Sequence, residues 1–324
     1  MSTPTPSTTE AIPLSQALGA DLQFGALHPL MHGQLSLNLV LDGEQITRCE
    51  FQVGFMHRGD EKLLEVRSYR QGLSHINRHQ WMSPAAPETA FAQCCEELMG
   101  LAVPPRAVAL RTLVCEMQIV TGVLLRLVGV AQSIGQPWRE LLVTRELWID
   151  AHEQLTGVRM HSSFVRLGGV AHDSAPSTLQ TISGLADQGV VVNVNFDSLR
   201  GFGIIDSVDS SERLATDVAR VNQAIENIKQ ITEDLIHVSG PIATTLPKVV
   251  RVPVGSSYKE ITATNGVTGV WLHSDGATTP MRVHLNTPSF RNLQTISTAA
   301  IGQTPRDLWS MLLTAPLALG EIDR

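Results

Sequence analysis

A β-hairpin pattern between residues 35 and 53 is the feature that most restricts how this chain can fold. Apolar residues alternate with polar ones on both sides of Asp42-Gly43: Leu35, Leu37, Leu39, Leu41, Cys49, Phe51 and Val53. Alternation around Asp-Gly is the strongest short-range signal for two antiparallel strands joined by a tight turn. The chain must therefore build antiparallel sheet in this region.

Two histidine-bearing segments, residues 25–33 and 53–62, flank this hairpin. His32 stands at its entry and His57 lies just past its exit, so the hairpin brings both towards one end of a small sheet. Nearby glycines let other groups approach the backbone closely. The two segments together predict a polar site, whereas His32 taken alone would be explained as a hairpin-end histidine bonded to backbone.

After the hairpin the hydrophobic period changes from two residues to about 3.6, which indicates helices. Residues 63–99 are predicted to be mostly helical, with breaks at prolines. Pro104-Pro105 restarts a helix whose broad apolar stripe predicts a central position. Pro137 opens another helix, which is predicted to end at Gly157.

The second half of the chain contains one weakly patterned segment and two clearer ones. Residues 172–211 are rich in Ser, Gly and Asp and are predicted to be loop with small elements. From Ser211 a long helix carries apolar residues at three- and four-residue steps, as in a bundle. A second hairpin is predicted around the turn at 274–276, and a helix around 306–313 precedes the C-terminal tail.

The composition limits the classes of protein to which this chain can belong. The formal net charge is −7 and no Lys/Arg cluster occurs, so we expect no nucleic-acid partner. The four cysteines form no Cys-x-x-Cys pair, which predicts a reduced, cytosolic protein without a metal cluster of its own. No apolar run reaches the ~18 residues of a membrane span, and residues 1–22 are predicted to be a disordered tail, not a signal peptide.

Five groups of segments, taken in order, resemble the quinone-pocket subunit of respiratory complex I (NADH-quinone oxidoreductase), which is related to the nickel–iron hydrogenase large subunit. The matching segments are His28–Gly33, Gly54–Lys62, Thr156–His161 with Arg166–Asp173, Ser274–Gly276 with Pro288–Gln294, and Gly320–Arg324. They recur in family order over nearly the whole chain beyond Phe24. The main difference is a contraction at about 174–212, where the family is considerably longer.

The resemblance implies an α+β fold of the hydrogenase-large-subunit type, with a central helical bundle and antiparallel β-hairpins towards both ends. We therefore expect a tail, 1–22, followed by a single domain, 23–324. Within that domain the expected parts are strands in 33–54, helices in 61–240, strands in 249–286, and a C-terminal helix and tail in 287–324.

The resemblance also implies a role in a membrane-associated NADH:quinone oxidoreductase of the complex I type, which couples electron transfer to proton translocation. This chain would form the quinone pocket with an iron–sulfur partner subunit that carries the terminal cluster. NADH would bind a different subunit, and quinone would be the substrate. The other expected partners are hydrophilic-arm and membrane-arm subunits, with the chain lying peripherally on the cytoplasmic face of the cell membrane.

An alternative is a degenerate paralogue that serves as a structural or assembly subunit without quinone turnover. In either case we expect no activity from the isolated chain and no cofactor bound by this chain alone. The two possibilities differ in whether the residues of the quinone pocket still support catalysis.

The resemblance assigns five residues to the site. His32 falls on the family's headgroup-binding histidine and is the predicted catalytic residue, because an imidazole with a pKa near 6.5 donates protons at neutral pH. Trp81 and Ser133 complete the predicted quinone-binding set. Arg78 and His161 fall on residues near the partner's cluster, where positive charge would stabilise its reduced form; without the match, Arg78 is simply a helix-surface arginine.

Three pocket positions depart from the family pattern. Trp81 stands where the family has a headgroup-binding tyrosine, Gln80 replaces a carboxylate, and Ser133 replaces the aspartate that pairs with the headgroup histidine. An indole N–H can donate a hydrogen bond but has no titratable proton near neutral pH, unlike a phenol. These changes predict weakened or lost quinone protonation.

Metal sites find little support in the sequence. The hydrogenase nickel–iron site needs two Cys-x-x-Cys pairs, and no thiolate stands at the corresponding positions, so we exclude that site. His75 and His79 could share a helix face at a spacing compatible with zinc, but no third ligand suggests itself. A solvated or partner-facing helix is the preferred interpretation, and we predict no metal.

Overall fold

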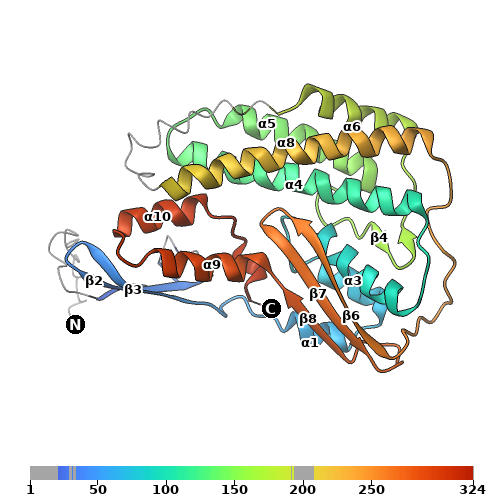
Figure 1. The fold of residues 1–324 in the computed structure, drawn as a ribbon, viewed down its shortest axis with the longest axis horizontal. Coiled ribbons are helices and arrows are strands. Elements are labelled where there is room, and N and C mark those ends of the chain that lie inside the picture. The colour runs from blue at the N-terminus through green and yellow to red at the C-terminus, as the bar shows by residue number, and fades with distance from the viewer. Residues whose placement is uncertain (1–20, 29–30, 32–33, 191, 193–207, 324) are drawn as a thin grey trace, which may run out of the picture.

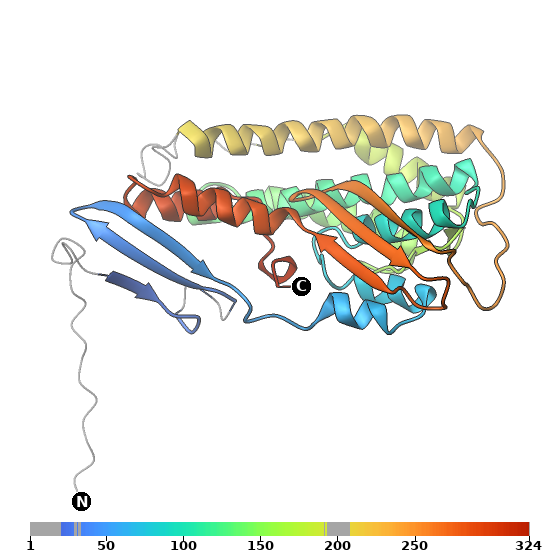
Figure 2. The ribbon, with the colours of Figure 1, turned by 60° about the horizontal axis from the view of Figure 1, so that its bottom comes forward.

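The computed structural model describes residues 21–28, 31, 34–190, 192 and 208–323 (Figure 1). Helices and antiparallel sheets both contribute, as the predicted α+β class requires. A helical bundle forms one layer, and a C-terminal sheet with shorter helices lies along it. A second, N-terminal sheet lies at one end of the molecule beside the last two helices (Figures 1 and 2).

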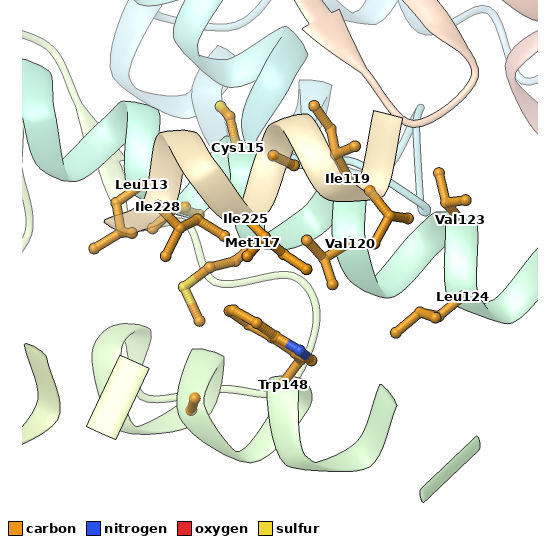
Figure 3. Close-up of a cluster of buried hydrophobic side chains, with 14 of the residues drawn as sticks. Leu113, Cys115, Met117, Ile119, Val120, Val123, Leu124, Trp148, Ile225 and Ile228 are labelled. Atoms are coloured by element: carbon orange, nitrogen blue, oxygen red, sulfur yellow. The ribbon is translucent and has the colours of Figure 1, made fainter. Parts of the chain in front are cut away.

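The bundle consists of α4 (Pro105–Ser133), α5 (Arg139–Thr156), α6 (Pro176–Gln188) and α8 (Val208–His237). Proline at the first turn of α4 and α6 starts these helices, and Gly157 in a left-handed conformation ends α5. The buried Trp148 of α5 lies against Met117 and Val120 of α4 (Figure 3). The bundle core is thus made of apolar side chains from several helices.

Helix α4 is long and apolar enough to cross a membrane by length and composition. However, 78% of its most apolar window is buried inside the fold by other elements. Helices α5 and α8 and neighbouring segments therefore cover the apolar surface of α4. Helix α4 is a core helix, as its apolar stripe predicted.

The C-terminal sheet has the strand order β6 (Gly255–Ala263), β7 (Gly266–Ser274) and β8 (Arg282–Asn286), all antiparallel. Its inner face packs against α3 (Ala85–Leu98), where Val270, Leu272 and Phe91 are buried in one cluster. The turn predicted at 274–276 follows β7, and β6 adds a strand before it.

The N-terminal sheet contains β1 (Asp21–Phe24), β2 (Ser36–Asp42) and β3 (Gln45–Gln52). Its buried leucines pack against α9 (Pro288–Ala299) and α10 (Pro305–Thr314). Strand β1 was not predicted, because its alternation of polar and apolar residues extends over only four residues. Residues 21 and 22 therefore belong to a strand rather than to the expected tail, and residues 1–20 lie outside the described residues.

The remaining elements are short: α1 (Asp60–Glu65), α2 (Tyr69–Ile76), β4 (Val165–Arg166), β5 (Gly169–Val170) and the 3-10 turn η2 (Leu319–Glu321). Two expectations need correction. Helix α6 occupies part of the segment interpreted as loop, of which residues 193–207 lie outside the described residues. The C-terminal part contains two helices, α9 and α10, instead of one.

Candidate functional site

An apolar cavity of about 780 Å³ lies between α4, α10 and the chain around Met31. Its lining consists of Met31, Leu35, Trp81, Met82, Leu125, Arg126, Gly129, Val130, Arg306, Trp309, Ser310, Leu312, Leu313, Ala315, Leu317 and Leu319. Most of these side chains are apolar, and few groups can hydrogen-bond. The cavity therefore suits a largely hydrophobic ligand with a small polar part.

The structure brings only some of the predicted quinone-site residues to this cavity. Trp81 lines it and is 39% exposed. His32 lies outside the described residues, but its neighbour Met31 is part of the lining. Ser133 is exposed in the last turn of α4, where its hydroxyl donates to the Gly129 carbonyl at 2.8 Å, and it is not among the described lining residues.

Arg126 is a cavity residue that the sequence argument did not assign to the site. Its Nε donates to Asp217 Oδ2 at 2.8 Å, and its Nη1 donates to Asn265 Oδ1 at 3.1 Å. The side chains of Arg126 and Asp217 are both almost fully buried. The sequence did contain a signal for Arg126: it is an arginine inside the most apolar helix, and a charge in that position needs a buried partner.

A second group of polar side chains, the Asp60 cluster, consists of Asp60, Arg58, His75 and His79. Asp60 Oδ2 lies 3.2 Å from His79 Nδ1, and Asp60 Oδ1 lies 3.4 Å from His75 Nε2. Arg58 Nη2 approaches Asp60 Oδ2 at 3.2 Å. Asp60 and His79 are buried, whereas the side chains of His75 and Arg58 are 22% and 53% exposed.

The electrostatics of the Asp60 cluster favour an ionised carboxylate. Burial alone would raise the pKa of Asp60, but the imidazoles of His75 and His79 and the charge of Arg58 lower it well below its usual range. His75 and His79 do not share one helical face, because α2 ends at Ile76 and His79 follows in a turn. Both reach Asp60 instead.

The C-terminal turn lies next to this cluster. Glu321 is fully buried and its Oε1 accepts hydrogen bonds from Ser289, while Asn265 Nδ2 lies 3.5 Å away. Burial raises the pKa of Glu321, against the opposing effects of Ser289, His79 and Asn265. Asp323 accepts from the amides of Gly54 and Met56 at 2.7 and 2.8 Å. Two segments that the resemblance singled out, 54–62 and 320–324, are thus joined directly.

Arg78 and His161, the residues predicted to lie near a partner's cluster, are close enough to interact. His161 is half-buried, and burial together with the charge of Arg78 lowers its pKa, against a backbone hydrogen bond at Asn77. Arg78 is exposed. Among the residues that the structure describes, no group of three or more His, Cys, Asp or Glu side chains is arranged to hold a metal ion.

Comparison with solved structures defines the class of fold. A chain of the membrane-bound sulfane sulfur reductase, an archaeal respiratory membrane complex, superimposes with a TM-score of 0.80, covering 97% of this chain and 100% of that chain at 24% sequence identity. The mixed helix-and-sheet fold is therefore that of a subunit found in a respiratory membrane complex.

Sequence comparison then identifies the family. The family described as "Respiratory-chain NADH dehydrogenase, 49 Kd subunit" matches residues 137–199 and 203–324. An NADH-quinone oxidoreductase subunit of Carboxydothermus hydrogenoformans is 30% identical over 93% of this chain and 98% of the relative. The corresponding subunit of Clostridium beijerinckii is 28% identical, covering 94% and 96%. The chain belongs to this family of oxidoreductase subunits, which confirms the resemblance.

Proposed function

We propose that this chain is the quinone-pocket subunit of a complex I-type NADH:quinone oxidoreductase and that the apolar cavity holds the quinone. The cavity at Trp81, in a chain of this family, is the observation that carries the proposal. Its volume lies within the roughly 300–1,000 Å³ typical of small-molecule sites. Its apolar lining suits a quinone ring and hydrocarbon tail, and the Trp81 indole N–H can donate to a ring oxygen.

Arg126 supports the same assignment because it places a permanently charged guanidinium in the cavity wall. Asp217 and Asn265 fix its orientation through the hydrogen bonds described above. A guanidinium has five N–H donors, of which the bonds to Asp217 and Asn265 use three. The others can donate to the negative charge that develops on a quinone oxygen during reduction. Trp81 cannot supply a proton, so the protons must come from other groups, His32 being the candidate that the sequence predicts.

We place the iron–sulfur partner subunit beside Arg78 and His161. Trp81 and Met160 are exposed hydrophobic residues that line one small cavity near this surface. Exposed apolar side chains next to the Arg78 guanidinium suit an interface with a protein that holds a reducible cluster, since positive charge favours the reduced form. The remaining hydrophilic-arm and membrane-arm subunits would complete the complex, with this chain peripheral on the cytoplasmic face of the cell membrane.

The structural or assembly role is the second candidate, and one observation favours it. Trp81 replaces a titratable phenol, and Ser133 lies away from the cavity, so two polar groups of the family's pocket are missing from the described part of the site. A chain that only holds the complex together would need the fold and the joined segments 54–62 and 320–324, but not the cavity.

The test is to fill the cavity in the complex purified from membranes through a tagged chain. A Cβ at Gly129 would meet no neighbouring atom within 4 Å, so Gly129→Leu adds bulk to the lining without a clash in the core. We expect the KM for quinone to rise about tenfold, the equivalent of ~1.4 kcal/mol, while NADH oxidation by a soluble artificial acceptor is unchanged.

Gly184→Leu in α6 is the matched control, because its Cβ also meets open space but Gly184 does not line the described cavity. This variant should keep the parental KM. Unaltered quinone kinetics in Gly129→Leu would exclude the cavity as the quinone site. A parental complex that assembles but reduces no quinone would favour the structural role.

A further inference from the structure

Several polar atoms behind the cavity wall are buried without a hydrogen-bond partner among the described residues. They are His79 Nε2, both side-chain polar atoms of Gln80, and Glu321 Oε2. All three side chains are buried, Gln80 and Glu321 completely. Leaving such groups unsatisfied costs about 1–3 kcal/mol each, so buried polar groups of this kind are normally satisfied by ordered water.

We call the region around the unpartnered atoms of His79, Gln80 and Glu321 the buried polar space. His79, whose charge acts on Glu321, connects this region with the protein surface. Its Nδ1 faces Asp60 at 3.2 Å, while its Nε2 carries no bond to the described chain. The other charged or titratable groups on the Asp60 side are His75 and Arg58, both of which reach solvent. An imidazole fixed at one nitrogen can exchange a proton at the other.

Glu321 connects the same space with the cavity. Its neighbour Asn265 accepts a hydrogen bond from Arg126, which is part of the cavity lining. Leu319, two residues before Glu321, also lines the cavity, and so does Trp81, the residue after Gln80. Burial raises the pKa of Glu321, which favours a neutral carboxyl that holds a proton.

We propose that water fills the buried polar space and that His79 and Glu321 form a proton relay from the surface to the cavity, with Asp60 as the residue that positions His79. The proposal rests on the cavity being the quinone site. Glu321 loses its O–H proton through water to a quinone oxygen that has been reduced by the partner's cluster. The His79 Nε2–H proton then passes through water to the Glu321 carboxylate, which leaves His79 neutral with its Nδ1–H on Asp60, and Nε2 is reprotonated from solvent through water.

Through this relay, His79 and Glu321 supply the protons that the Trp81 indole cannot donate. Asp60 Oδ2 lies 3.2 Å from His79 Nδ1 and thereby fixes the orientation of the ring. His79 and Glu321 are relay residues, and no direct contact between them and the quinone is required.

The experiment uses the assembled complex with Glu321→Gln and, separately, His79→Gln. We expect quinone reduction to fall at least tenfold at pH 8 and by less at pH 6, where protons from bulk water are more abundant. The solvent deuterium isotope effect on quinone reduction should rise in both variants. NADH oxidation by a soluble artificial acceptor should stay at the parental rate, which shows that electron entry is intact.

Asp60→Asn tests positioning without removing a relay residue. Loss of the carboxylate that fixes His79 Nδ1 should change the pH profile of quinone reduction and lower the maximum rate by less than His79→Gln does. The matched control is His284→Gln, because His284 Nδ1 pairs with Glu61 at 3.0 Å on the exposed sheet, outside the relay. It should retain the parental pH profile.

Two results would overturn the relay. One is a Glu321→Gln complex with the parental rate, pH profile and isotope effect. The other is a high-resolution structure of the complex that shows the space between His79, Gln80 and Glu321 without water. If the parental complex reduces no quinone at any pH, the proposed function fails instead, and that outcome is separate because it appears before any variant is made.

Discussion

Two regions of the molecule are buried: the helical bundle, and the junction where α1, α2 and the C-terminal turn meet. They differ in the kind of side chain that is buried. In the bundle, Leu113, Val120 and Ile228 are fully buried among other apolar side chains. In the junction, Asp60, His79 and Glu321 are buried and some of their polar atoms lack a partner in the described chain. Apolar burial stabilises the fold, whereas polar burial costs free energy unless it is satisfied.

The buried ion pairs lie between these extremes. Arg111 with Glu96, and Arg126 with Asp217, are buried, and none of their buried side-chain polar atoms lacks a partner. The first pair joins the consecutive helices α3 and α4, and the second joins α4 to α8. The junction differs because some of its buried polar atoms have no hydrogen-bond partner in the described chain. Local departures from good packing and pairing concentrate at functional sites, so this contrast distinguishes the part of the chain that builds the fold from the part that we expect to carry function.

The largest expected effect comes from breaking a satisfied pair. Glu96 accepts from Arg111 Nη1 at 3.0 Å, from Arg111 Nη2 at 2.6 Å and from the amide of Gly168 at 2.8 Å. Glu96→Gln leaves the guanidinium buried without its counter-charge, and we expect the free energy of unfolding to fall by about 3–5 kcal/mol. Urea unfolding followed by tryptophan fluorescence measures this.

The control for this prediction is the next residue in sequence. Glu97 pairs with Lys259 on the surface, so Glu97→Gln should leave the unfolding free energy nearly unchanged. Equal effects of the two substitutions would show that the buried Glu96–Arg111 pair contributes no more to stability than an exposed pair. The bundle side of the comparison would then have no measurable effect on the unfolding free energy.

The second prediction concerns a buried carboxyl whose charge the fold disfavours. Burial raises the pKa of Glu88 to about 8, although Asn77 donates to it and Arg166 lies near. Between about pH 5 and pH 8 the unfolded chain ionises this group and the folded chain does not, so stability falls as pH rises. Glu88→Gln should therefore add roughly 2–4 kcal/mol of stability at pH 8 and almost none at pH 4.5.

Unfolding curves of Glu88→Gln and the parental chain at the two pH values measure this difference. A gain of the same size at both values would mean that packing or hydrogen bonding, and not the titration of Glu88, is responsible. Glu116→Gln is a useful comparison, because burial raises its pKa as well but the side chain is only partly buried, so its gain should be smaller.

The sequence predicted the bundle better than the junction, for a physical reason. A stripe such as that of α4 has a period of 3.6 because one face of the helix is buried, so the period reveals the helix. The contact of His75 and His79 with Asp60 joins residues about 15–19 apart across a turn, and no local period records it. The pairing of Asp323 with Gly54 and Met56 is longer-range still.

The candidate site was predicted only in part, and mainly through the resemblance. It directed attention to Trp81, which lines the cavity, and to Arg78 and His161, which interact. It singled out the segments that contain Asp60 and Glu321 but gave neither residue a role, and it did not indicate Arg126. The roles of these residues depend on which buried partners the fold gives them. Strand β1 and helix α6 were missed because their local patterns are weak.

The smallest expected effect separates binding at the cavity from proton supply at the junction. Trp81→Tyr places a phenol where the indole N–H now stands in the cavity lining. A better-directed hydrogen bond to a quinone oxygen is worth about 1 kcal/mol, so the KM for quinone should fall roughly fivefold. If protons arrive through His79 and Glu321, kcat should change by less than twofold, because the phenol adds a hydrogen bond but no rate-limiting proton.

Steady-state kinetics of the purified complex with a range of quinone concentrations give both constants. Trp138→Tyr, at the start of α5 and outside the described cavity lining, is the control and should change neither. A large rise in kcat for Trp81→Tyr, with the KM unchanged, would mean that the missing phenol limits proton delivery. The quinone would then be protonated by groups in the cavity itself, and the buried polar groups of the junction would have only a structural role.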